Sequence, residues 1–304
     1  MPSAVSVVVA TRNYGRFLAG AIRSVLDQTF TNLEVVVVDD GSTDDTPDVV
    51  RPFLADPRVR YLRTDGLGQS RAKNLGIQQA RGPLVAFLDG DDEWLPMKLG
   101  RQLPLFADPA VGVVYSRRTL MDAAGRDLPT PPTVLARGYV YDTLLVQNPV
   151  CFSSAVVRKD VFNAVGLFDP NLPLSIDYDL WLRVAPHFAF DYVDEPLVRY
   201  RTGHGNLSSR IAERLLGVLA ILRRSLGRRR NAETAEPAAQ AAAWGSTCRT
   251  MGFVLRLERP LAAAGWYARA ARHDRRWMSS AKAILGGLIR RSPKREARAT
   301  PASS

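Results

Sequence analysis

The sequence is poor in cysteine. Its two cysteines, Cys151 and Cys248, are far apart along 304 residues, and neither belongs to a C-x-x-C pair. Two isolated cysteines do not make a disulfide framework, so no cystine-stabilised fold is expected. Buried thiols in a reducing compartment are the simpler interpretation.

Long hydrophobic runs are also missing. A membrane-spanning helix needs about 18 consecutive apolar residues, whereas the longest apolar run in the C-terminal half extends only from Leu215 to Leu222. The N-terminal residues, MPSAVSVVVATRN, lack the basic region and the long apolar core of a signal peptide. We therefore expect a cytoplasmic protein.

The glycine fingerprint of dinucleotide-binding proteins is absent as well. No G-x-G-x-x-G follows the first apolar run, Val5 to Ala10. Those glycines let the backbone approach a pyrophosphate closely. Their absence argues against a nucleotide-dependent oxidoreductase.

Positive charge is in excess, but only in the last third of the chain. The formal net charge is +11. Residues 1–210 carry 22 basic and 24 acidic side chains, whereas residues 211–304 carry 19 basic and 6 acidic ones. This asymmetry predicts two parts with different roles, a near-neutral domain over 1–210 and a basic helical appendage over 211–292. Residues 293–304 are expected to form a disordered tail.

The first hundred residues alternate between strand and helix patterns. Short β-branched runs that predict buried strands cover residues 5–10, 33–38, 59–62 and 84–88. Helical patterns cover residues 18–26, a stretch from Ser42 or Thr43 to about 54, and 70–80. Such alternation is typical of an α/β fold with a mostly parallel, doubly wound sheet. Polar residues collect after the strands, at the edge where such sheets bind ligands.

Residues 110–210 have a less regular pattern. Strands are expected over 111–115 and 191–201, and helices over 159–166 and 178–186. We expect residues 1–109 to form one half of the domain and residues 110–210 to complete its cleft.

Three carboxylates follow the fourth predicted strand, in the run LVAFLDGDD. Asp89, Asp91 and Asp92 repel one another when placed so closely. A divalent cation that prefers oxygen ligands, Mg²⁺ or Mn²⁺, removes that repulsion. The alternative is a solvated acidic turn before a helix at Trp94, with Asp92 as the helix cap.

Four further polar residues are candidates for a site. Asp40 ends the second strand and can bind a nucleobase or ribose, or close an Asx turn. Lys73, early in a helix, can offset a diphosphate or lie on that helix's polar face. Asp177 can act as a general base or cap the helix that follows it. His204, alone in a loop, is expected at the surface.

The order and spacing of these segments resemble the inverting family-2 glycosyltransferases of the GT-A fold. The resemblance runs from Val5 to about Ser208. It is carried by VSVVVATRNYGRFLAGAIRSVLDQTF, VVVVDDGSTDDT, GQSRAKNLGI, VAFLDGDDEWLPMKL and the pair GLFDP and DYDLWLR. It implies transfer of a sugar from a nucleotide-diphosphate donor to a hydroxyl of a glycan or lipid-linked glycan, with residues 1–109 binding the donor.

The resemblance also implies roles for individual residues on the donor side. Ala10 and Thr11 border the nucleotide pocket, and Asp40 recognises the base. Lys73 and Asn74 stand where the family usually has Arg-Asn and lie near the donor phosphates.

The D-x-D pair of the family corresponds to Asp89 and Asp91. Asp91 is the principal implied protein ligand of Mn²⁺ or Mg²⁺, with Asp89 beside it. His204 falls in the late histidine loop of the family as a further candidate metal ligand. Two residues separate it from Tyr200-Arg201, where the family usually has one.

The implied mechanism is a single displacement with Asp177 as the catalytic base. Asp177 accepts a proton from the acceptor hydroxyl as that oxygen attacks the anomeric carbon, and the cation stabilises the leaving nucleoside diphosphate. Inversion follows because no protein nucleophile intervenes. The family often has a glutamate before its base, where this chain has Ile176.

A phosphatase is a competing interpretation. Haloacid-dehalogenase-type phosphatases also place D-x-D after a buried strand and would use Asp89 as a nucleophile. Glu93 stands where they usually have Thr or Val, and their later acidic pair is missing.

The basic region 211–292 has interpretations of its own. The stretch from Leu215 to Leu222 precedes an arginine cluster, and residues 282–291 repeat that arrangement. Such segments predict peripheral attachment to an anionic membrane at its inner face, either of the enzyme or of a degenerate transferase acting as an adaptor. The alternative is a helical appendage packed on protein. Nucleic acid is not expected as a partner, because aromatic residues are not interleaved with most of these arginines.

Overall fold

The computed structural model describes residues 3–205, 210–227, 235–256 and 259–274. The chain divides into two compact units, residues 1–240 and 241–304. Within the described ranges, no helix is long and apolar enough to cross a membrane. The expected tail at 293–304 and the second basic stretch at 282–291 lie outside the described residues.

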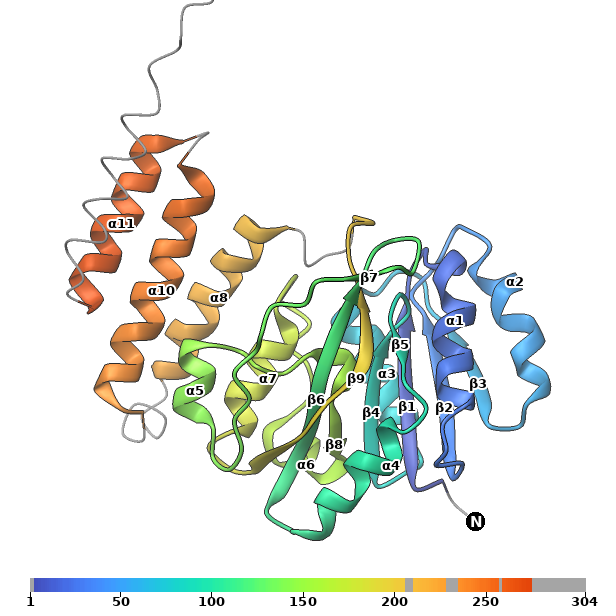
Figure 1. Ribbon diagram of the computed structural model, residues 1–304. Coiled ribbons are helices and arrows are strands. Elements are labelled where there is room, and N and C mark those ends of the chain that lie inside the picture. The colour runs from blue at the N-terminus through green and yellow to red at the C-terminus, as the bar shows by residue number, and fades with distance from the viewer. Residues whose placement is uncertain (1–2, 206–209, 228–234, 257–258, 275–304) are drawn as a thin grey trace, which may run out of the picture. The chain divides into compact units, whose positions relative to one another are not determined.

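Four parallel strands form the first half of the sheet, in the order β3-β2-β1-β4 (Figure 1). They are β1 (Val5–Thr11), β2 (Leu33–Asp39), β3 (Val59–Arg63) and β4 (Leu84–Asp89). Each ends one residue beyond its predicted end. The predicted α/β fold is therefore confirmed where the strand pattern was most regular.

Helices cover both faces of these strands because both faces are apolar. Val35 and Val37 belong to the main core together with residues of α1 (Gly15–Leu26). Val36 and Val38 point to the other face, where they pack with Ala72 of α3 (Gln69–Gln79). Alternate residues of a strand face opposite sides, so a continuous valine run buries both.

The second helix does not begin at Ser42 or Thr43, as expected. Instead α2 spans Thr46–Val50 and passes into a 3₁₀ turn, Arg51–Ala55. The Asn13 backbone N donates to Ser42 Oγ at 2.9 Å, and the Thr43 backbone N donates to Asn13 Oδ1 at 2.8 Å. Ser42 and Thr43 therefore join the loops after β1 and β2 and cap no helix.

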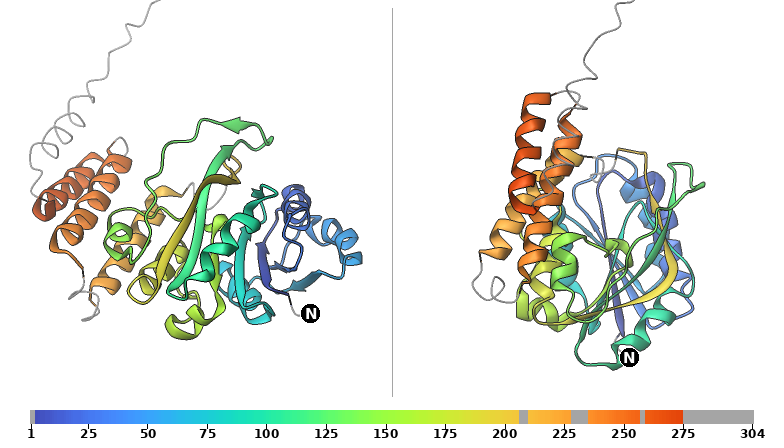
Figure 2. Two further views of the ribbon diagram at one scale, coloured as in Figure 1. Left: turned by 60° about the horizontal axis from the view of Figure 1, so that its bottom comes forward. Right: turned by 60° about the vertical axis from the view of Figure 1, so that its left-hand side comes forward.

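The second half of the sheet makes it a mixed sheet. β6 (Val111–Met121) and β9 (Ala189–Arg201) run parallel along most of their length (Figure 2), and β8 (Val156–Arg158) is antiparallel between β4 and β6. Two short strands, β5 (Glu93–Trp94) and β7 (Asp127–Leu128), pair antiparallel with β9 and β6. The helices here are α4 (Lys98–Gln102), α5 (Tyr141–Val146), α6 (Lys159–Val165) and α7 (Ile176–Val184).

The strand directions bring distant loops to one edge of the sheet. β8 is antiparallel to both β4 and β6, and β9 is parallel to β6. The carboxyl ends of β1, β2, β4, β6 and β9 therefore lie at the same edge. The acidic loop after β4 and the histidine loop after β9 must meet there, although about 110 residues separate them.

The helix α8 (Ile211–Leu226) belongs to the first compact unit. Arg224 forms ion pairs with Asp169 at 2.5 Å and with Asp179 of α7. The Ser225 and Tyr141 hydroxyls are 2.8 Å apart. The functional division at residue 210 stays a prediction, while α8 is fastened to the domain that precedes it.

The second unit contains the C-terminal helices α10 (Pro237–Leu255, whose first turn still belongs to the first unit) and α11 (Pro260–Asp274). A Cβ atom at Gly252 would lie 3.0 Å from the ring of Tyr267, so glycine permits close packing of the two helices. The rings of Trp244 and His273 stack with centroids 5.6 Å apart. The predicted C-terminal helices are thus present.

Candidate active site

The carboxylates after β4 do not form a solvated turn. Asp91 and Asp92 are buried, whereas the Asp89 side chain is 32% exposed. Burial, aided by the nearby Asp89 carboxylate, raises the pKa of Asp91 to about 7. Asp92 accepts hydrogen bonds from Ser153 Oγ at 2.5 Å and from the Arg201 backbone N at 2.8 Å. The alternative with Asp92 as a helix cap is wrong, because the next residues form β5.

His204 is buried, so the expectation of a surface histidine is also wrong. Its side chain is fully shielded from solvent, and its Nε2 lies 2.9 Å from Asp91 Oδ2. The rings of Tyr14 and Phe17 pack edge-on against the imidazole. Burial, followed by the charges of neighbouring arginines, lowers the pKa of His204. The imidazole therefore faces the D-x-D carboxylate Asp91.

Arg201 and Glu93 hold the acidic loop in place, and the sequence analysis missed both. Arg201 Nε donates to the Asp91 carbonyl at 2.8 Å, and its Nη2 forms an ion pair with Glu93 at 2.8 Å. Its guanidinium also lies 4.6 Å from the centre of the Phe17 ring. The one signal available in the sequence was that Arg201 ends a predicted strand just before the histidine loop.

Lys73 lies beside the D-x-D pair, as a diphosphate-binding cation would. Its Nζ is 2.7 Å from Asp89 Oδ1 and 4.2 Å from the centre of the Phe152 ring. The side chain is almost entirely buried. Lys73 is therefore not part of a solvated polar face of α3.

Asn74, the next residue, is used in the packing of α3. Its Nδ2 donates to the Phe168 carbonyl at 2.8 Å, and its Oδ1 accepts from the Phe168 backbone N at 2.9 Å. The amide thereby fastens α3 to the turn after α6. Contact of Asn74 with donor phosphates stays a prediction.

Asp40 is buried at the end of β2 and joins two loops. Its carboxylate accepts hydrogen bonds from Thr64 Oγ1 at 2.7 Å, Leu67 N at 2.6 Å and Gly68 N at 2.8 Å. Both oxygens therefore already have protein donors. Recognition of a base by Asp40 stays a prediction.

Ala10 and Thr11 end β1 next to the acidic loop. Ala10 pairs with Asp89 in the parallel register of β1 and β4. The Thr11 hydroxyl is buried and has no hydrogen-bond partner among the residues that the structure describes. A Cβ atom at Gly90 would lie only 2.9 Å from that hydroxyl, so glycine permits the close approach of the two loops.

Asp177 is the second residue of α7, which follows a left-handed residue, Ser175, whose φ is 58°. Asn148 Nδ2 donates to Asp177 Oδ2 at 3.3 Å. Burial raises the pKa of Asp177, and the charges of Lys73 and Asp89 are close enough to affect it. The role of Asp177 as a general base stays a prediction.

Asp179, two residues further along α7, has a structural role. It is buried and forms ion pairs with Arg183 at 3.0 Å and with Arg224. Arg183 also donates to the carbonyls of the turn after α6, at residues 165–167. These bonds fix α7, and Asp177 with it, against the rest of the domain.

Comparison with known proteins agrees with this arrangement. The sequence model of glycosyl transferase family 2 matches residues 6–166, just over half of the chain. The chain belongs to this family. Family 2 membership confirms the resemblance found in the sequence and sets aside the phosphatase interpretation.

One curated relative of this family-2 chain is an uncharacterized glycosyltransferase of Nostoc sp., which is 34% identical over 174 residues, 55% of this chain. The chain spans about half of that relative's length and about a third of the next ones.

Solved structures confirm the fold. S. aureus TarS 1–349 superposes with a TM-score of 0.64 at 21% identity, covering 94% of this chain and 88% of its own, and another TarS structure holds UDP-GlcNAc. The mannosyltransferase PcManGT from Pyrobaculum calidifontis, in complex with GDP-Man and Mn²⁺, has a TM-score of 0.62 at 17% identity over 95% of this chain and 86% of its own.

Proposed function

We propose that this family-2 member transfers a sugar from a nucleotide-diphosphate donor to a hydroxyl of a glycan or lipid-linked glycan, with inversion at the anomeric carbon. The observation that carries the proposal is the meeting of Asp91, His204 and the Lys73–Asp89 pair at one edge of the sheet, within electrostatic range of Asp177. This arrangement supports a site with charged groups for a diphosphate and a base for a hydroxyl.

The donor would lie over the ends of β1, β2 and β4. Lys73 offers a buried cation beside the D-x-D pair, and the Thr11 hydroxyl is available at the end of β1. Proteins of the same fold hold UDP-GlcNAc and GDP-Man in their structures, which supports a nucleotide-sugar as the donor class. Base recognition by Asp40 would require a change in its present hydrogen bonds.

A divalent cation, Mn²⁺ or Mg²⁺, fits the residues present. Asp91 offers a carboxylate, and both ring nitrogens of His204 are buried without a hydrogen bond to any described residue. The described part of the chain holds no group of three or more potential ligands. Two protein ligands with phosphate and water oxygens are a common arrangement for such a cation. When bound, it would supply positive charge beside the leaving diphosphate.

Asp177 would act on the acceptor. Its carboxylate accepts the hydroxyl proton as the acceptor oxygen forms a bond to the anomeric carbon, and the bond from that carbon to the diphosphate breaks with its electron pair leaving on the nucleotide. The raised pKa brings Asp177 closer to the range in which a base is effective at neutral pH. Asn148 orients the carboxylate through its hydrogen bond.

A nucleotide-sugar screen tests the proposal. Full-length protein with Mn²⁺ is expected to release nucleoside diphosphate from at least one nucleotide-sugar, slowly with water and faster with a hydroxyl acceptor. Calorimetric titration of the same panel gives donor affinity independently of turnover. Failure to bind or hydrolyse any member of a panel covering uridine, guanosine and deoxythymidine donors would contradict the proposal.

We further propose that the basic C-terminal region attaches the enzyme to the inner face of a membrane. The helix α8 does not offer a membrane-binding face. Its residues Leu219, Ile221 and Leu222 are buried, and Arg224 forms ion pairs within the protein. The remaining candidates are the cluster Arg228-Arg229-Arg230 and the basic stretch 282–291, which both lie outside the described residues. Basic residues near an anionic surface contribute on the order of 1 kcal/mol each.

Liposome co-sedimentation tests this attachment. Full-length protein is expected to sediment with anionic vesicles and not with neutral ones, and less so as salt is raised. Replacing Arg228, Arg229 and Arg230 by serine is expected to weaken binding by about tenfold or more, as the loss of roughly 1 kcal/mol per charge implies. If the wild-type protein sediments with neither anionic nor neutral vesicles, the attachment is excluded.

A further inference from the structure

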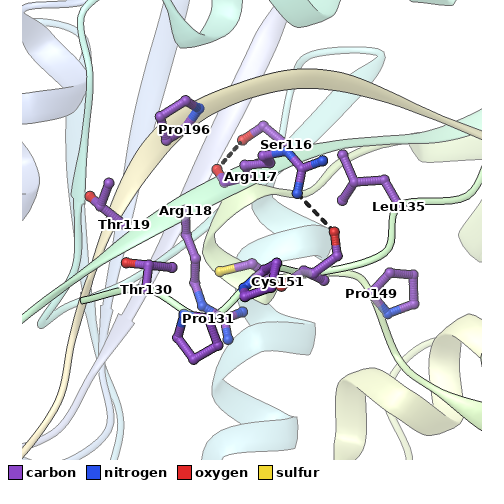
Figure 3. Close-up of a pocket in the computed structure, with 12 residues that line it drawn as sticks. Ser116, Arg117, Arg118, Thr119, Thr130, Pro131, Leu135, Pro149, Cys151 and Pro196 are labelled. Carbon is purple, nitrogen blue, oxygen red and sulfur yellow. Dashed lines mark hydrogen bonds between the residues drawn. The ribbon is translucent and has the colours of Figure 1, made fainter. Parts of the chain in front are cut away.

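A cavity of about 260 Å³ lies between β6, β9 and the segments 130–135 and 149–151 (Figure 3). None of the residues assigned above to donor, cation or base lines it. Its walls are largely apolar, with Leu135, Cys151 and four prolines, Pro131, Pro132, Pro149 and Pro196. The volume is below the range of about 300–1,000 Å³ typical of sites for whole ligands, so it suits one unit of a longer molecule.

Arg118 brings an uncompensated charge to this cavity. It is half-buried, and its Nε is shielded from solvent without a hydrogen-bond partner among the described residues. Its guanidinium lies 5.1 Å from the centre of the Tyr200 ring. Such stacking orients the guanidinium plane and leaves the in-plane N–H groups able to bind a ligand. Burial raises the pKa of the Cys151 thiol to about 11, so Cys151, which shares a hydrogen bond with the Arg118 side chain, is a neutral thiol that does not balance the charge of Arg118.

The neighbouring Arg117 differs from Arg118 because its guanidinium has a carboxylate partner. Arg117 forms an ion pair with Asp194, and its Nη1 donates to the Thr133 carbonyl at 2.8 Å (Figure 3). The pairing register of β6 with β9 shifts on both sides of Arg117. Such bulges re-aim side chains. Arg117 fastens the cavity wall, while Nε of Arg118 keeps its hydrogen-bonding capacity.

The cavity adjoins the proposed catalytic base through one short segment. Asn148 donates to Asp177, and the next residues, Pro149 and Cys151, line the cavity. The charge of Asp92, in the acidic loop, is close enough to affect Cys151. The cavity lining thus begins one residue after the side chain that contacts the proposed base.

We propose that this cavity is an acceptor subsite for an acidic unit, in which Arg118 binds an oxyanion of the acceptor while the proline walls contact its apolar surface. This inference rests on the proposed transfer reaction and adds the acceptor's chemical class. The oxyanion is either a carboxylate of an acidic sugar or a phosphate of a phosphodiester-linked chain. A guanidinium binds both through charge-assisted hydrogen bonds.

Binding of short oligomers to full-length protein tests the subsite without relying on turnover. Saturation-transfer NMR titrations would use trigalacturonate as the carboxylate probe, a glycerol-phosphate trimer as the phosphate probe and maltotriose as the neutral probe. One acidic probe is expected to bind at least about tenfold more tightly than maltotriose, and Arg118→Gln is expected to remove that difference. Arg118→Lys should retain part of it, because it keeps the charge and loses the planar donors.

Arg126→Gln is the matched control. Arg126 carries the same charge as Arg118 and lies just after the end of β6. Its side chain is 81% exposed and does not line the cavity. This variant is expected to bind all three probes as wild type does. Thermal melting of each variant checks that it is folded. With an active acceptor, Arg118→Gln should raise KM for that acceptor about tenfold or more, whereas Arg126→Gln should leave that KM and the hydrolysis of the donor by water unchanged.

The outcomes separate this inference from the reaction on which it rests. Equal binding of all three probes, no binding of either acidic probe, or unchanged acidic binding in Arg118→Gln would overturn the subsite even if nucleotide-sugars are hydrolysed. Selective acidic binding that Arg118→Gln abolishes, in a protein that processes no nucleotide-sugar, would support an anion site and refute the transferase proposal.

Discussion

Replacing Asp91 with asparagine is expected to lower the turnover number of sugar transfer by about 10³-fold or more while the protein stays folded. Asp91 is the carboxylate that faces His204, and the proposed cation would stabilise the charge that develops on the leaving diphosphate. A loss of about 4 kcal/mol of transition-state stabilisation corresponds to that factor. The melting temperature should be unchanged or higher, because Asp91 and Asp89 repel each other in the protein without a cation. Initial rates at saturating donor and thermal melts measure both effects.

Chelation should have the same effect on the wild-type enzyme. Excess chelator is expected to abolish transfer, and added Mn²⁺ or Mg²⁺ should restore it. Asp48→Asn is a matched control for Asp91→Asn, since Asp48 is a 68% exposed carboxylate that pairs with Arg51 on the surface. Full activity of wild type in excess chelator would show that no divalent cation takes part.

Asp177→Asn is expected to lower the rate of transfer by about 10²- to 10⁴-fold, the contribution usual for a general base. The dissociation constant of the donor should stay within error of wild type, because the base acts on the acceptor hydroxyl. The isosteric amide can still accept a hydrogen bond from Asn148. Calorimetric titration of the donor and single-turnover transfer rates measure the two quantities separately.

Asp179 offers a control on the same helix. Asp179→Asn removes a buried charge from its ion pairs with Arg183 and Arg224, so it should lower the melting temperature. Its effect on catalysis should be smaller than that of Asp177→Asn. If Asp177→Asn instead weakens donor binding and leaves the rate of transfer intact, Asp177 belongs to the donor site and the base is another residue.

Much of the fold could be predicted because its signals are local. The valine runs of β1 and β2 are apolar on both faces, and only a strand covered on both sides buries such a run. Acidic and polar residues directly after these strands then fall at the ligand-binding edge. The D-x-D pair and Asp40 were found in this way.

The errors arose where a residue's partner is far away in sequence. Ser42 and Thr43 look like helix caps, but Asn13 of the neighbouring loop binds them. Asp92 also looks like a cap, yet Ser153 and Arg201 provide its hydrogen bonds. Local helix propensity cannot predict such contacts, because they form only when particular strands are neighbours in the sheet.

The sequence by itself determined the α/β class, the basic C-terminal region and the chemical types of the D-x-D and base residues. Only the tertiary structure decided that the His204 side chain is buried against Asp91, that Arg201 fastens the acidic loop and that Arg118 lines a cavity with Pro149 and Cys151. Strand order is the physical reason. The antiparallel β8 between β4 and β6 aligns the ends of β4 and β9 at one edge, and that alignment is a property of non-local pairing.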